Sequence, residues 1–167
     1  MREYFPKSKK NTLKAPKMPL NDYILSHRHL VVACHDVFIA YQGGILLVLR
    51  DNKPAKGILW PIGGRIERGV GIEKSLKIKV KEECGLTISK IKELGCGRTL
   101  FVEDPFKHNH GTDTLNIVFF AEGHGKLKLN KLHKDPVIII KKKYTPKFSK
   151  SLAPYVRNFL EKALKMV

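Results

Sequence analysis

Two adjacent carboxylates, Glu82 and Glu83, end a stretch of sequence whose apolar spacing is typical of an amphipathic helix. A glycine pair, Gly63 and Gly64, and a polar loop precede this stretch. Carboxylates in the last turn of a helix face the negative end of the helix dipole, which disfavours them unless a cation lies nearby. A divalent metal is one candidate, because Mg²⁺ prefers a few carboxylates together with water and phosphate oxygens.

Basic side chains that suit a phosphorylated ligand surround the same stretch. Arg50 and Arg65 flank the glycine pair, and arginine offers a planar fork of donors that matches phosphate oxygens. Lys79 lies four residues before Glu83, so the two side chains can share one helix face. Lys79 therefore either adds fixed positive charge at a nucleotide site or only forms an ion pair with Glu83.

A hydrolase would also need a general base to activate water, and histidine titrates in the range that suits this task. His133 is our candidate for this role. Four other side chains compete for it: Glu103, Asp104, His108 and His110. Three aromatic residues could stack on a nucleobase or pack in the core: Trp60, Phe101 and Phe106.

The elements that would position these residues alternate between strands and helices. Apolar runs predict strands over residues 30–40, 45–50, 95–102 and 114–122, with residues 87–94 irregular or a short strand. Glycines in residues 41–44 predict a hairpin turn. The apolar stripe of the central helix consists of Ile72, Leu76, Val80 and Cys84, and Gly85 is its natural stop.

A second amphipathic helix is predicted over residues 151–166 at the end of the chain. Strands followed by a helix, further strands and another helix predict an α/β (α+β) fold, with a mixed sheet between helices. At 167 residues the chain has the length of one domain. We expect a basic, flexible tail over residues 1–19 and a single domain over residues 20–167.

The glycine pair and the helix that follows it resemble the Nudix box, G-x5-E-x7-R-E-U-x-E-E-x-G-U, in which U is a bulky apolar residue. Gly64 matches the first glycine, and the end of the box is matched by Val80, Glu82, Glu83, Gly85 and Leu86. The likeness extends over about residues 28–145. It implies a Nudix-like α/β/α sandwich and hydrolysis of a nucleoside diphosphate derivative with Mg²⁺ or Mn²⁺.

The box departs from this pattern at three positions. Val70 and Lys79 stand where glutamates are expected, and Ile78 stands where arginine is expected. These losses argue against ordinary diphosphate cleavage with several metal ions. They favour a site that holds fewer metals, in which Lys79 replaces part of the missing charge.

A narrower branch, the GDP-mannose mannosyl hydrolases, also has a broken box, and this chain resembles it. Residues 50–57 read Arg-Asp-Asn-Lys-Pro-Ala-Lys-Gly and are followed by Gly63-Gly64-Arg65 and then Glu83, at the spacing of that branch. Leu132 departs from the branch, because a polar metal ligand is expected directly before the late histidine.

That resemblance implies a role for each candidate residue. His133 would be the base, and Arg50 and Arg65 would stabilise the departing nucleoside diphosphate after cleavage at the anomeric carbon of a sugar. Asp36 and Asp113 would contact sugar hydroxyls, with Lys79 also on the substrate. The metal ligands would be Glu83 and the Gly63 carbonyl, with Glu82 either assisting them or simply solvated.

Two other functions compete with a nucleotide-sugar hydrolase. One is a conventional Nudix pyrophosphohydrolase that acts on another nucleotide. The other is a catalytically weak Nudix-fold module that binds nucleotide or RNA. The net charge of +17, from 32 Lys and Arg against 15 Asp and Glu, favours anionic partners and supports weak polyanion binding through the basic ends of the chain.

The cysteines and the hydropathy of the sequence indicate in which cellular compartment the protein is expected. Three cysteines without zinc-type spacing suit a reducing compartment, and we expect a cytoplasmic protein. No apolar run is long enough for a transmembrane helix, so no membrane partner is expected. A homodimer is compatible with the sequence.

Overall fold

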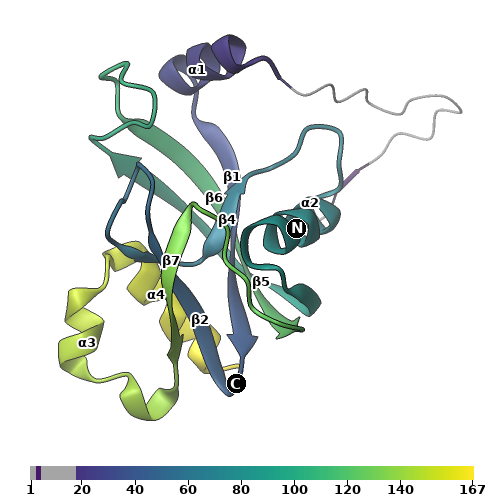
Figure 1. Cartoon of the computed structure of the whole chain (residues 1–167), viewed down its shortest axis with the longest axis vertical. Coiled ribbons are helices and arrows are strands. Elements are labelled where there is room, and N and C mark those ends of the chain that lie inside the picture. The colour runs from purple at the N-terminus through teal and green to yellow at the C-terminus, as the bar shows by residue number, and fades with distance from the viewer. Residues whose placement is uncertain (1–2, 5–17) are drawn as a thin grey trace, which may run out of the picture.

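The computed structural model describes residues 3–4 and 18–167 (Figure 1). The elements are α1 (Leu20–His29), β1 (Val32–Tyr41), β2 (Gly44–Arg50), β3 (Leu59–Trp60), β4 (Ile62–Arg65), α2 (Ile72–Cys84), β5 (Thr87–Phe101), β6 (Thr112–His124), β7 (His133–Ile139), α3 (Pro146–Ser151) and α4 (Pro154–Leu164), with a 3₁₀ turn at Lys141–Lys143. Nearly all of the predicted N-terminal tail lies outside the described residues. No helix in the described ranges is long and apolar enough to cross a bilayer.

Seven strands form a single mixed sheet in the part of the chain that the structure describes. Its main order is β3-β2-β1-β6-β5, with β4 beside β1 and β7 beside β2. β1 and β6 run parallel, while the other neighbouring strands are antiparallel. β4 pairs with Cys34–Val37 of β1, and β2 pairs with Ile39–Tyr41, so both lie along the same edge of β1.

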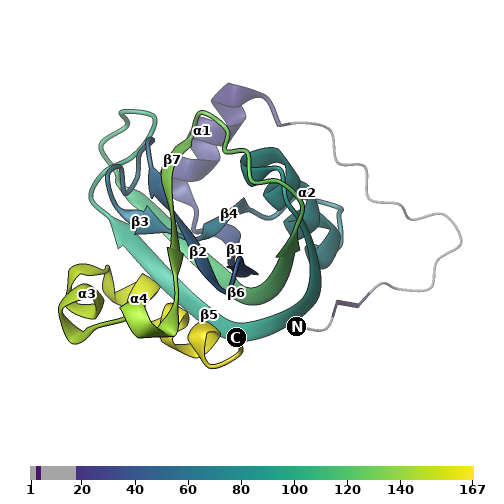
Figure 2. The ribbon, with the colours of Figure 1, turned by 60° about the horizontal axis from the view of Figure 1, so that its bottom comes forward.

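Helices cover both faces of the sheet, as the sequence predicts (Figure 2). On one face, Val37 and Ile39 pack against the apolar stripe of α2. On the other face, Phe38 packs in a core that includes Val156 and Phe159 of α4. Because side chains of a strand alternate between faces, β1 is buried on both sides, and its residues are mostly apolar except for the buried His35 and Asp36.

Two local predictions are confirmed by backbone geometry. α2 ends at Gly85, whose φ of 72° is the left-handed conformation that commonly stops a helix. The turn between β1 and β2 consists of Gln42 and Gly43, with φ of 48° and 79°. Positive φ at both central residues is the geometry of a type I′ hairpin turn.

Two predicted boundaries are wrong. Residues 87–101 form one long strand, β5, which keeps its pairing with β6 by means of two register shifts and Gly95 at a φ of 133°. The helix predicted over residues 151–166 begins only at Pro154, as α4, and a separate short helix, α3, precedes it, with Leu152 and Ala153 extended between the two. Pro154 explains the break, because a residue before proline is disfavoured in helical conformation.

Candidate functional site

A cavity of about 370 Å³ lies on the α4 side of the sheet, where β1, β4, β5 and β6 come together. Its charged lining residues are Asp36 of β1, Arg50 at the end of β2, and Arg65 of β4, with Lys53 from the following loop. Its aromatic lining residues are Tyr23, Trp60, Phe101 and Phe106. The structure therefore brings together three of the predicted substrate-binding side chains beside several aromatic rings.

Arg50 is a cation held inside the protein. Its Nε donates a hydrogen bond to the carbonyl of Pro54 at 2.9 Å. Burial lowers the pKa of Arg50, while the carboxylates of Asp36 and Glu83 act in the opposite direction. Within the described residues, the two terminal guanidinium nitrogens make no hydrogen bond, so they remain available to an anionic ligand.

Asp36 is 3% exposed and belongs both to the cavity and to the core. The Tyr155 hydroxyl of α4 donates to Asp36 Oδ2 at 2.6 Å, and the Tyr155 ring stacks on Trp60 with centroids 5.1 Å apart. Burial raises the pKa of Asp36 to about 6, although Tyr155 and Arg50 oppose this shift. Tyr155 is thus a site residue that no local sequence signal indicates.

The raised pKa of Asp36 predicts a pH-dependent cost of folding. The folded pKa of about 6 lies above the unfolded value of 3.8, so ionisation of Asp36 removes stability as the pH rises through this window. Relative to the wild type, Asp36→Asn should therefore gain about 3 kcal/mol of stability between pH 4 and pH 7. Urea unfolding at four pH values measures this difference. An unchanging difference would contradict the prediction, and Asp22→Asn on the exposed surface of α1 is the control.

Gly63 cannot carry a side chain, because β4 runs very close to β1 at this point. Gly63 is paired with Asp36, and a Cβ at position 63 would collide with Asp36 Oδ1 and the His35 carbonyl. Gly64, with a φ of 155°, lies against the aliphatic part of Lys79. Gly63 therefore lets β4 bring its backbone up to the buried carboxylate, whereas Gly64 is favoured by its positive φ.

Glu83 and His133 form a buried pair behind Arg50. His133 Nε2 and Glu83 Oε2 are 2.9 Å apart, and His133 Nδ1 is buried without a hydrogen-bond partner among the described residues. His133 is the first residue of β7, where it pairs with Arg50. Neither side chain of the pair lines the cavity itself.

Arg65 lines the cavity but is partly covered by α1. Its guanidinium lies 4.7 Å from the centre of the Tyr23 ring, and Glu67 is 3.9 Å away. Tyr23 also packs edge-on against Phe106 of the loop between β5 and β6. His27 of α1 hydrogen-bonds His108 of the same loop at 2.8 Å. Helix α1 and this loop therefore close one side of the cavity together.

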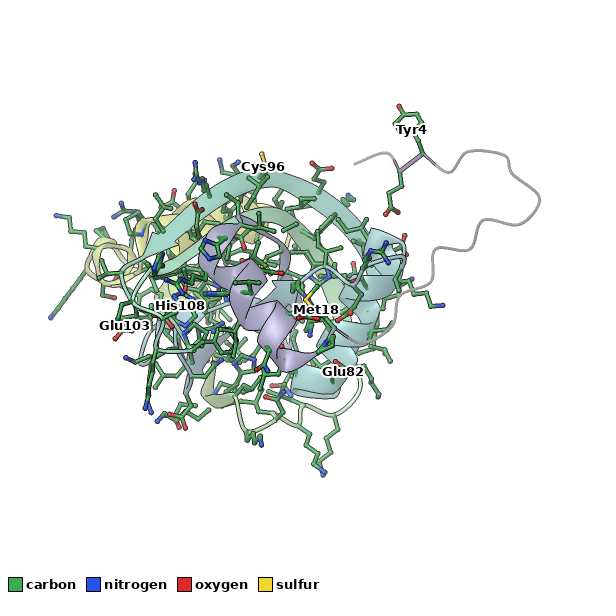
Figure 3. All side chains as sticks on the ribbon, turned by 90° about the horizontal axis from the view of Figure 1, so that it is seen from above. Tyr4, Met18, Glu82, Cys96, Glu103 and His108 are labelled. Carbon is green, nitrogen blue, oxygen red and sulfur yellow. The ribbon has the colours of Figure 1, made fainter. Side chains whose placement is uncertain are left out.

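Glu82 and Asp113 do not line the cavity. The Glu82 side chain is 63% exposed and its nearest cation is Lys79, at 3.9 Å. Figure 3 shows Glu82 at the surface, well away from Glu103 and His108. Asp113 forms a two-pronged ion pair with Arg98, at 2.9 and 2.6 Å, and does not line the cavity.

The competing candidates for the base have structural partners. Asp104 accepts three backbone N–H groups, from Phe106, His108 and Asn109, and so holds the loop between β5 and β6 in shape. Glu103 is half-exposed and lies 3.4 Å from Lys53. His110 accepts a hydrogen bond from Arg28 of α1 at 3.2 Å.

These donors do not fit a resident cluster of metal ions. The described residues contain no group of three or more His, Cys, Asp and Glu side chains that could hold one. Glu83 already shares one oxygen with His133, and Lys79 occupies the helix position of a carboxylate. That Glu83 and the Gly63 carbonyl hold a single ion, with its other ligands from phosphate and water, stays a prediction.

The fold is that of the Nudix hydrolases. The chain superimposes on a MutT Nudix hydrolase from Burkholderia pseudomallei with a TM-score of 0.63 and 18% identity, covering 80% of this chain and 98% of that one. It superimposes on a MutT protein from Methanosarcina mazei with a TM-score of 0.62 and 18% identity, covering 81% and 94%. These structures confirm the predicted fold class.

One curated relative matches in sequence. An ADP-ribose pyrophosphatase from Methanocaldococcus jannaschii is 35% identical over 106 residues, which are 64% of this chain. The match spans 58% of that relative, a little over half its length. No protein-family model matches the chain.

Proposed function

We propose that this chain hydrolyses a nucleoside diphosphate linked to a sugar. The observation that carries the proposal is the meeting of Arg50 and Arg65 with the buried Asp36 at one aromatic-lined cavity. Two arginines suit a diphosphate, and a carboxylate suits the hydroxyls of a sugar. The Methanocaldococcus jannaschii relative is an ADP-ribose pyrophosphatase, which supports a substrate of this class.

We place the cleavage at the anomeric carbon, with release of free sugar and nucleoside diphosphate, as for GDP-mannose. Attack at phosphorus is helped by metal ions that contact both reacting oxygens, and residues 3–4 and 18–167 contain no cluster of carboxylates for such a group of ions. Arg50 and Arg65 can instead stabilise a departing diphosphate by fixed positive charge. Cleavage of the pyrophosphate bond is the second candidate, because the name of the relative favours it.

His133 remains our candidate base, with Glu83 as the residue that orients it. The two are 2.9 Å apart through His133 Nε2, which leaves Nδ1 as a buried ring nitrogen without a partner in the described part of the chain. An acceptor of this kind suits a water molecule that gives up its proton. The Glu83 carboxylate would stabilise the imidazolium that forms.

The test is a product assay in ¹⁸O-labelled water with ADP-ribose, GDP-mannose, a dinucleotide and a nucleoside triphosphate. Each is incubated with Mg²⁺, with Mn²⁺ and with a chelator. Labelled free sugar with unlabelled nucleoside diphosphate supports the proposal. A nucleoside monophosphate with label in a phosphate establishes the second candidate. Absence of turnover with every substrate would overturn both and leave a nucleotide- or polyanion-binding module.

Lys79→Glu should change the metal requirement of the reaction. A carboxylate at this position adds an oxygen ligand near Gly64 and removes fixed positive charge. We expect about tenfold slower turnover at limiting Mg²⁺ and a steeper dependence on Mg²⁺ concentration. Titration of the rate against Mg²⁺ measures both. Lys77→Glu, an exposed change on the same helix, is the control, and coincident curves for Lys79→Glu and wild type would contradict the role.

A further inference from the structure

We infer that the uncharged side of the cavity is a nucleobase subsite, in which Asn116 accepts a hydrogen bond from an N–H group at the edge of the base. This inference rests on the proposed function, because it places the nucleobase of a ligand whose diphosphate is bound by Arg50 and Arg65. The subsite consists of three side chains on β5 and β6, namely Thr99, Thr114 and Asn116.

The three side chains share the face of the sheet that lines the cavity. Thr99 and Thr114 are paired between β5 and β6, and Asn116 lies two residues further along β6. Asn116 is 4% exposed and Thr99 is 8% exposed. Polar side chains buried this deeply need hydrogen-bond partners, and these three supply them mainly to one another.

The contacts of Asn116 fix which end of its amide faces inward. Asn116 Nδ2 lies 3.2 Å from Thr99 Oγ1, 3.0 Å from Thr114 Oγ1, 3.4 Å from the Gly97 carbonyl and 3.5 Å from the Thr114 carbonyl. Backbone carbonyls can only accept hydrogen bonds, so the amide end between them must be the NH₂ group. Within the described residues, all four hydrogen bonds of the Asn116 side chain are made by Nδ2, and none is made to the carbonyl oxygen, Oδ1.

A second amide oxygen at the same cavity also lacks a donor. Asn52 lines the cavity from the loop after β2, and its Oδ1 is buried without a hydrogen-bond partner among the described residues. An unpaired buried acceptor costs free energy that a bound donor recovers. Apart from the two arginines, which are donors for the diphosphate, the amide oxygens of Asn52 and Asn116 are acceptors without a donor among the described residues, which suits a ligand edge that carries N–H groups.

The position of Asn116 relative to Arg65 matches the layout of a nucleotide. Cys34 of β1 pairs with Asn116 on one side and with Arg65 on the other, so two strand spacings separate them. This corresponds to about 10 Å, since neighbouring strands are about 4.8 Å apart. The diphosphate at the arginines and the base at Asn116 would therefore lie at opposite sides of one cavity.

The walls of the subsite suit a flat base better than a sugar or a phosphate. Phe101 and Phe106 line the cavity, and Phe101 meets Trp60 edge-on with centroids 5.7 Å apart. Aromatic faces stabilise a planar heterocycle by stacking. The Thr99, Thr114 and Asn116 cluster carries no charge, so it offers no compensation for a phosphate.

Binding measurements with three probes test the subsite on the full chain. Isothermal titration calorimetry compares ADP, inorganic pyrophosphate and purine riboside 5′-diphosphate, which lacks only the exocyclic amino group of ADP. We expect wild type to bind ADP about tenfold more tightly than purine riboside 5′-diphosphate. Asn116→Ala should weaken ADP about tenfold, leave pyrophosphate unchanged and abolish the preference between the two nucleotides.

Matched variants separate the subsite from a general loss of structure. Thr99→Val removes one hydroxyl at constant shape and should weaken ADP but not pyrophosphate, whereas Asn158→Ala, on the exposed surface of α4, should change neither. Equal affinity of wild type for the two nucleotides, or an Asn116→Ala variant that retains the preference, would overturn the inference. If wild type binds neither ADP nor pyrophosphate, the proposed function itself fails.

Discussion

Replacement of Arg50 by lysine is expected to lower kcat/KM by about 10²- to 10³-fold, with a small change in Tm. Arg50 Nε is fixed by the Pro54 carbonyl at 2.9 Å, which aims the two terminal nitrogens of a planar group. A lysine keeps the charge but offers one nitrogen on a flexible stem, so it cannot make both contacts. Loss of one preorganised donor to a developing negative charge typically has an effect of this size.

The matched control for Arg50→Lys is Arg98→Lys on β5. Arg98 is exposed and forms its ion pair with Asp113 away from the cavity, so its replacement should leave kcat/KM nearly unchanged. Steady-state kinetics with the substrate identified by the product assay supply the comparison. If Arg50→Lys turned over like wild type, the diphosphate could not lie where we place it.

The sequence predicts best those features that depend on neighbours in the chain. The helix over Ile72–Cys84, its stop at Gly85 and the hairpin turn at Gln42-Gly43 follow from spacing and from glycine conformation, and the structure confirms them. The two-faced burial of β1 also follows from its apolar run. Each of these depends on residues within a few positions of one another.

The site is harder to predict because its contacts are distant in sequence. Tyr155 and Asp36 are separated by 119 residues, and nothing local to either residue indicates the other. The neutral residues of the cavity carry no charge or motif, so only the register of β5 on β6 brings Thr99 and Asn116 together. Asp113 shows the opposite case, in which a residue close in sequence to cavity residues lies outside the cavity. Thr112 and Thr114 line the cavity, and because side chains alternate along β6, Asp113 between them points to the other face of the sheet.

The broken box has a physical explanation in the packing of α2 against β4. Lys79 runs past Gly64, and Glu83, one turn later, meets His133 in the interior. A glutamate in place of Lys79 would add a third carboxylate to the helix turn that carries Glu82 and Glu83, where like charges repel one another. Lysine avoids this repulsion without a metal ion, which supports our proposal of a site with fewer metals.

Replacement of Glu83 by glutamine is expected to lower kcat/KM by about 10²- to 10³-fold while the protein stays folded. The amide of glutamine keeps an oxygen that can accept from His133 Nε2, so the buried pair survives without its negative charge. Both roles that we assign to Glu83, stabilising a charged His133 and holding a cation, require that charge. Glu83→Ala should lose activity and also about 1–3 kcal/mol of stability, because His133 then has a buried nitrogen without a partner.

The comparison between the two Glu83 variants separates chemistry from folding. Thermal unfolding should place Glu83→Gln near wild type and Glu83→Ala clearly below it, while kinetics should place both far below wild type. Glu82→Gln, at the neighbouring exposed position on the same helix, is the control and should retain full activity. A Glu83→Gln variant with wild-type kcat/KM would show that the buried pair is only structural. A neutral side chain would then be sufficient at position 83, although both the base His133 and the bound cation are proposed to need the negative charge of Glu83.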